Sequence, residues 1–142
     1  MEQSVFVVVD GDSLGRQARR LVVERILGDA SHVGPILSVF VAGKEDAVRK
    51  KIAELFRSHC PEAEIVERRP GPRKNSADNL CLFYAGQFLG REMARERSVT
   101  MYVVSNDKAI LWGATEILKQ GHRLVVVTDP KITTLPEQHP LF

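Results

Sequence analysis

The stretch VFVVVDGD, residues 5–12, combines an uninterrupted apolar run with an abrupt acidic end. Consecutive β-branched and aromatic residues without polar alternation predict a strand covered on both faces, as in a parallel sheet. Asp10 and Asp12 follow directly where this strand should end. The stretch therefore predicts a buried parallel sheet with acidic side chains at its carboxyl edge.

Similar apolar runs recur along the chain, and helical patterns separate them. The runs occupy residues 36–41, 101–104 and 124–127, with a weaker one at 64–66. Apolar residues at helical spacing fill the intervals, over residues 14–26, 47–56, 76–88 and 109–118. This alternation predicts an α/β fold, a three-layer α/β/α sandwich around a mostly parallel five-stranded sheet.

The size and composition of the chain are those of one ordinary globular domain. The chain has 142 residues, 44% hydrophobic and 27% charged, which excludes disordered and collagen-like classes. Its net charge of +2 means that any site for a polyanion must come from local clustering. We expect a single domain over residues 1–129, followed by an irregular tail over 130–142, where three prolines fall.

Targeting and membrane signals are missing from the sequence. The first four residues carry no basic region, and the apolar run that follows is shorter than the ~7–15 residues of a signal-peptide core. No run approaches the ~18 apolar residues of a membrane span. We therefore expect a cytoplasmic protein that does not associate with membranes.

Four aspartates fall at equivalent ends of the predicted topology. Asp10 and Asp12 follow the first strand, Asp107 follows the fourth, and Asp78 opens the third helix. In open α/β sheets the functional crevice lies outside the carboxyl ends of the strands, so these side chains should converge there. Clustered carboxylates repel one another unless a cation joins them, and Mg²⁺ or Mn²⁺ suits such ligands. The alternative is that aspartates at strand ends cap the next helix, which for Asp12 or Asp78 alone is the simpler interpretation.

The segment RRPGPRK, residues 68–74, is the one concentrated basic loop. Its position just before Asp78 predicts that its basic residues hold substrate phosphates beside the acidic residues; they are Arg68, Arg69, Arg73 and Lys74. A solvated turn is the alternative. The histidines lack metal-ligand spacing, the serines lack a paired histidine, and no glycine-rich phosphate loop is present.

Three segments together resemble the PIN-like nucleases, including the NYN-type branch. They are VVDGDS (residues 8–13), KNSAD (74–78, leading into FYAG at 83–86) and VVSNDK (103–108). The resemblance extends roughly over residues 5–127, and the middle segment is its most specific part. It implies a parallel α/β/α sandwich that hydrolyses RNA phosphodiesters with a divalent metal, and single-stranded RNA as the partner. A homodimer or a protein partner stays open.

Carried over position by position, the resemblance implies an acidic catalytic set. Asp10, Asp78 and Asp107 match the metal-binding aspartates, and Asp12 matches the acidic residue that supports the metal or orients the water. We expect substrate contacts from polar residues of the same segments: Arg73, Lys74, Asn75, Ser105 and Asn106.

The chain also departs from the family pattern. Many members carry a further aspartate shortly after the position of Asp107, where residues 109–111 read AIL. Many NYN members have an acidic residue where this chain has Phe83 and Tyr84. Because the chain has fewer carboxylates than the family pattern, we expect either one metal ion and weak activity, or a catalytically inactive module that binds RNA or protein.

A phosphatase is the third interpretation. The Asp-x-Asp of residues 10–12 resembles that of haloacid dehalogenase-type phosphatases, with Ser105 as the later hydroxyl residue and Lys108 or Lys119 as the lysine. Against this, Ser13 and Leu14 replace the usual Gly-Thr pair. This interpretation also leaves residues 74–78 without a role.

Overall fold

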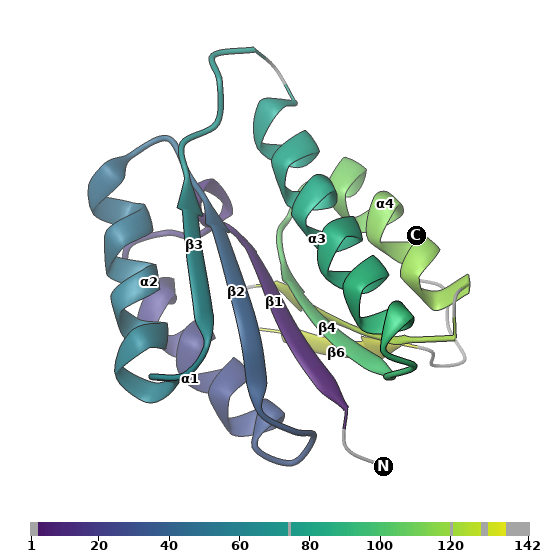
Figure 1. The fold of residues 1–142 in the computed structure, drawn as a ribbon. Helices are drawn as coiled ribbons and strands as arrows, with labels where there is room; N and C mark the ends of the chain where they lie inside the picture. The colour runs from purple at the N-terminus through teal and green to yellow at the C-terminus, as the bar shows by residue number, and fades with distance from the viewer. Residues whose placement is uncertain (1–2, 74, 120, 129–130, 136–142) are drawn as a thin grey trace.

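Strands and helices alternate along the described part of the chain, which in this computed structural model comprises residues 3–73, 75–119, 121–128 and 131–135 (Figure 1). The elements are β1 (Ser4–Asp10), a 3-10 turn η1 (Gly11–Ser13), α1 (Ala18–Ala30), β2 (Ile36–Ala42), α2 (Asp46–His59), β3 (Glu64–Arg68), α3 (Ser76–Ala94), β4 (Val99–Val104), α4 (Lys108–Lys119), β5 (Arg123–Thr128) and β6 (Lys131–Leu135).

The strands form one sheet in the order β3-β2-β1-β4-β5-β6. Strands β1 to β5 pair in parallel, and β6 pairs antiparallel with β5. The chain moves outward from β1 to β3, then returns to place β4 on the other side of β1. Since ligand crevices of open α/β sheets form where the strand order reverses, the carboxyl ends of β1 and β4 mark the expected site.

The predicted α/β sandwich with five mostly parallel strands is confirmed, but the predicted irregular tail is wrong over Lys131–Leu135. That segment forms β6, in which Val126 of β5 pairs with Thr133. Its sequence KITTL is rich in β-branched residues, and the prolines at 130 and 136 flank it without interrupting it. Residues 136–142 lie outside the described part of the chain.

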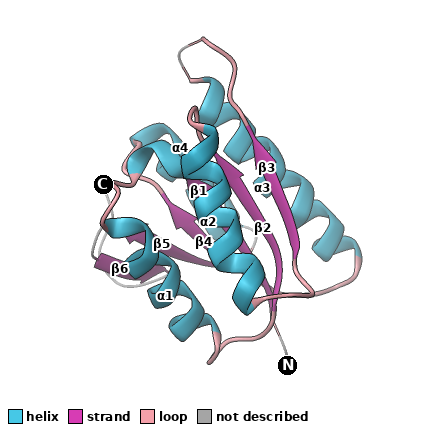
Figure 2. Cartoon of the chain, turned by 90° about the vertical axis from the view of Figure 1, so that its left-hand side faces the viewer, coloured by secondary structure: helices cyan, strands magenta, loops and turns pink. Residues whose placement is uncertain are grey.

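Helices cover both faces of the sheet (Figures 1 and 2). The odd-numbered residues of β1 pack with α1 and α2, whereas Phe6 and Val8 pack with α3 and α4. Every residue of β1 is buried, which is why its sequence shows no polar alternation. In the described residues, no helix is both long enough and apolar enough to cross a membrane.

A buried carboxylate ties the end of α3 to the amino-terminal edge of the sheet. Glu92 is fully buried, and its Oε1 accepts a hydrogen bond of 2.6 Å from Ser4 Oγ. Three arginines surround it: Arg95 at 3.3 Å, Arg97 at 3.6 Å and Arg91 at 4.0 Å. This cluster satisfies the buried charge and holds α3 in place along the sheet.

We predict that Glu92→Ala lowers the free energy of unfolding by about 2–4 kcal/mol, since it removes charge-assisted hydrogen bonds and leaves Ser4 without its acceptor. Glu92→Gln should cost less because its amide oxygen can still accept from Ser4. Chemical denaturation measures both. The control Glu54→Ala, at an exposed position of α2, should change stability by less than about 0.5 kcal/mol. Equal stability of Glu92→Ala and the control would contradict a supporting role.

Candidate active site

Asp10 ends β1 at the point where the strand order reverses. Its side chain is only 6% exposed, and its Oδ2 accepts a hydrogen bond of 2.8 Å from Ser13 Oγ. Ser105 Oγ, at the end of β4, lies 3.4 Å from the same oxygen. Asp10 Oδ1 is buried and has no hydrogen-bond partner among the residues that the structure describes. Such an orphaned carboxylate oxygen is unusual, because buried polar atoms are normally satisfied.

A cleft of about 280 Å³ opens beside Asp10. Four loops at the carboxyl edge of the sheet line it, those after β1, β2, β3 and β4 (Figure 1). Its lining residues are Asp10, Asp12, Lys44, Pro70, Gly71, Arg73, Asn75, Ser76, Ala77, Asp78 and Asp107. The structure therefore brings together all four aspartates that the sequence analysis singled out.

The first turn of α3 delivers Asp78 into this cleft. Asn75 precedes the helix with a left-handed φ of 70°, a conformation that asparagine tolerates better than most residues. Its carbonyl accepts a hydrogen bond of 3.0 Å from the backbone N–H of Asn79. Asp78, only 6% exposed, lies at the amino-terminal end of the helix, where the macrodipole favours a negative charge.

We expected helix capping by Asp12 or Asp78, but the aspartate that caps a helix is Asp107. Asp107 Oδ1 accepts a hydrogen bond of 2.8 Å from the backbone N–H of Ala109, and so caps α4. Asp12 Oδ1 instead accepts one of 3.1 Å from the backbone N–H of Lys44, in another loop. The side chain of Asn75, the residue at the N-cap of α3, forms no capping hydrogen bond with described residues.

Burial and neighbouring carboxylates raise the pKa values of Asp10 and Asp78. Burial, followed by the charges of Asp12 and Asp107, raises the pKa of Asp10, whereas hydrogen bonds from the Ser13 hydroxyl and the Asp12 backbone N–H lower it. Burial also raises the pKa of Asp78, to which the charge of Asp107, a side-chain hydrogen bond with Asp107 and the charge of Asp10 add. The cleft therefore concentrates negative charge that a cation would offset.

The expected substrate-binding residues divide into two groups. Arg73 and Asn75 line the cleft, and Arg73 is exposed. Ser105 and Asn106 are not among the residues that line the cleft. Ser105 Oγ accepts from the Asp107 N–H at 2.9 Å, and Asn106 hydrogen-bonds to Ser13. These two residues fix the β4–α4 loop against the end of β1. Lys74 lies outside the described part of the chain.

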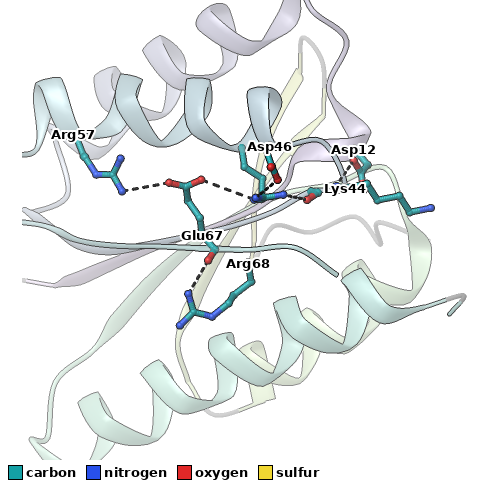
Figure 3. Close-up of polar contacts among 8 residues, drawn as sticks. Asp12, Lys44, Asp46, Arg57, Glu67 and Arg68 are labelled. Atoms are coloured by element: carbon teal, nitrogen blue, oxygen red, sulfur yellow. Dashed lines mark hydrogen bonds and ion pairs between the residues drawn. The ribbon is translucent and has the colours of Figure 1, made fainter. Parts of the chain in front are cut away.

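Sequence reasoning missed the residues that hold the β2–α2 loop at the cleft wall. Arg49 Nη1 donates to the carbonyl of Gly43 at 2.7 Å, and Nη2 pairs with Asp46 at 2.6 Å. Glu67 lies 3.9 Å from Arg49 Nε and 3.4 Å from Arg57, extending the network to β3 (Figure 3). The sequence feature that could have indicated this network is Arg49 itself, which stands at helical spacing with the buried Ile52 and Phe56 on the core side of α2.

The cleft offers suitable donors for a metal but not a finished metal centre. Within the described residues, no three acidic, histidine or cysteine side chains form a group positioned to hold an ion. The donor chemistry nevertheless fits Mg²⁺ or Mn²⁺, which prefer carboxylate oxygens. Asp10 Oδ1, unpartnered within the described part of the chain, and the raised pKa values of Asp10 and Asp78 are what an uncompensated carboxylate site would show.

Compared with known proteins, the chain matches no protein-family model, no curated protein and no solved structure. The resemblance to PIN-like nucleases therefore depends on the three sequence segments alone.

The raised pKa of Asp10 predicts a pH-dependent stability cost. Because the folded state holds this proton more tightly than the unfolded state, the free energy of unfolding falls as pH rises above the ordinary aspartate value of 3.8. Asp10→Asn removes this cost, so without divalent ions the variant should melt above the wild type at pH 7. The difference should vanish at pH 3. Thermal unfolding in EDTA across this pH range measures it.

Asp46→Asn is the matched control, because the pKa of Asp46 is shifted in the opposite direction from that of Asp10. A hydrogen bond and the charge of Arg49 lower the pKa of Asp46, so its ionised form stabilises the fold above the ordinary aspartate pKa. This variant should melt below the wild type at pH 7 and approach it in acid. If Asp10→Asn behaved like Asp46→Asn, carboxylate repulsion in the cleft would be refuted.

Proposed function

We propose that the chain is a divalent-metal-dependent ribonuclease of the PIN-like type, hydrolysing phosphodiester bonds of single-stranded RNA in the cleft beside β1. One observation carries the proposal: Asp10, Asp78 and Asp107, from three distant segments, line one cleft at the strand-order reversal together with Arg73. Such an enzyme needs at least acidic side chains that bind a metal ion and a basic side chain that pairs with the substrate phosphate.

Asp10, Asp78 and Asp107 would hold the ion, which when bound activates water and offsets charge on the phosphodiester. Asp10 is held by Ser13 and backed by Ser105, so its carboxylate is fixed before any ligand arrives. Arg73 lines the same cleft and would pair with a substrate phosphate.

Asp12 and Lys44 both line this cleft, and they lie side by side in the structure (Figure 3). Asp12 is exposed, and its Oδ1 is held by the Lys44 amide. Its carboxylate would orient a water, and the Lys44 ammonium would add a second positive charge for phosphate.

A second candidate is a non-catalytic RNA-binding module of the same fold. The specific observation in its favour is that Asp107 caps α4 and that no finished three-ligand metal group exists in the described residues. A phosphatase receives less support, because Asp78 lines the cleft but has no role in that chemistry.

The deciding experiment measures cleavage of end-labelled single-stranded RNA in Mn²⁺, in Mg²⁺ and in EDTA. We expect metal-dependent cleavage that Asp10→Asn and Asp78→Asn each reduce by at least about 100-fold, since a metal supplies several kcal/mol of transition-state stabilisation. Glu54→Gln, an exposed carboxylate on α2, is the matched control and should retain full activity.

The outcomes separate the candidates. Cleavage that survives in EDTA or in both aspartate variants would exclude the proposed site. RNA binding by folded protein without cleavage in any metal would establish the binding module instead. Hydrolysis of a phosphomonoester that is lost in Lys108→Ala but kept in Asp78→Asn would establish the phosphatase.

A further inference from the structure

A second groove, of about 210 Å³, runs between β3 and α3 on the face of the sheet away from α2. Three alternate residues of β3 form one wall and one side of α3 forms the other. Its lining residues are Glu64, Val66, Arg68, Tyr84, Gln87, Phe88 and Arg91. None of them lines the acidic cleft, so the groove is a separate surface.

Two aromatic stacks, each with an arginine over it, build this groove. Phe40 of β2 stacks on Tyr84 with ring centroids 4.3 Å apart, and the Arg68 guanidinium lies 5.9 Å from the Tyr84 centroid. The second stack, Phe6 on Phe88 at 4.4 Å, has the Arg91 guanidinium 5.3 Å from the Phe88 ring. Both guanidinium groups are thus held in place by packing.

The charge of the groove is only partly neutralised. Arg68 donates to the backbone carbonyl of Glu67, and no carboxylate within the described residues lies within ion-pair distance of it. The Glu67 carboxylate is on the other side of β3, facing Arg57 (Figure 3). Arg91 is 4.0 Å from Glu92, whose charge Arg95 and Arg97 share.

The groove joins the acidic cleft through the β3–α3 connection. Arg68 ends β3, and the loop that follows contributes Pro70, Gly71 and Arg73 to the cleft wall. Near the same end, Phe83 is 63% exposed and meets Tyr84 edge-on at 5.4 Å. A chain leaving the cleft along β3 would therefore meet an exposed ring and then two guanidinium groups in succession.

We propose that this groove binds a single-stranded nucleic acid segment that extends from the cleft, a binding site in addition to the hydrolytic one. Arg68 and Arg91 contact successive phosphates or stack on bases with their planar faces, and Phe83 offers a ring for a further base. Glu64 is the one acidic residue in the lining and lies at the far end of β3 from Arg68. The proposal depends on the proposed function for its choice of polymer.

The test is binding of a fluorescein-labelled single-stranded RNA of about 12 nucleotides to the full chain in EDTA, where no metal-dependent cleavage occurs. We expect Arg68→Ala and Arg91→Ala each to weaken binding about fivefold to tenfold, as the loss of a charge-assisted contact should. Each should also reduce the slope of log affinity against log salt by about 0.7.

Matched variants separate the role of the groove from net charge and from folding. Arg20→Ala removes one exposed arginine from α1, on the other face of the sheet, and should leave affinity within twofold of the wild type. Arg68→Lys keeps the charge but loses the planar group, so it should recover the salt slope without recovering full affinity. Thermal unfolding of every variant confirms that it is folded.

The outcomes distinguish this proposal from the nuclease itself. Metal-dependent cleavage with unchanged RNA binding in the Arg68→Ala/Arg91→Ala double variant would overturn the proposal that the groove binds RNA. It would leave the proposed nuclease activity standing. Binding lost in the double variant, in a protein that cleaves nothing, would support the groove and reject the nuclease. Equal affinity for poly-glutamate of similar length would overturn it in favour of an acidic polypeptide partner.

Discussion

The burial of β1 on both faces is the constraint on which the rest of the molecule depends. Its odd-numbered valines anchor α1 and α2, while Phe6 and Val8 anchor α3 and α4, and its two edges pair with β2 and β4. A strand enclosed in this way has only its ends available for polar chemistry. Asp10 stands at one end, and Ser4, which holds Glu92, stands at the other.

The burial of β1 also explains why the ionised form of Asp10 in the cleft is energetically unfavourable. Asp10 belongs to the rim of the core, so water cannot fully solvate its carboxylate, and Oδ2 accepts from the Ser13 hydroxyl whereas Oδ1 has no partner among the described residues. Asp78 and Asp107 then add negative charge from two other elements. Functional sites commonly store destabilisation of this kind, which a ligand of opposite charge relieves.

The layer architecture could be predicted from the sequence because parallel strands buried on both faces leave a distinctive apolar run. The grouping of the aspartates was predictable for the same reason, since the carboxyl ends of parallel strands share one edge. β6 was missed because its flanking prolines indicated a loop, although the residues between them favour a strand. The Arg49 network and the arginine-covered aromatic stacks were not predictable, because they depend on contacts between elements far apart in sequence.

The cap that Asp107 places on α4 would restrict how this residue binds the proposed metal ion. Because Oδ1 accepts from the Ala109 amide, chelation of one cation by both carboxylate oxygens would compete with the cap, whose loss costs about 1 kcal/mol. A small ion such as Mg²⁺ in octahedral geometry is satisfied by one oxygen from each carboxylate, whereas Ca²⁺ often gains from chelation by both. In the proposed metal site, the cap would therefore favour the smaller ion through the geometry of a single side chain.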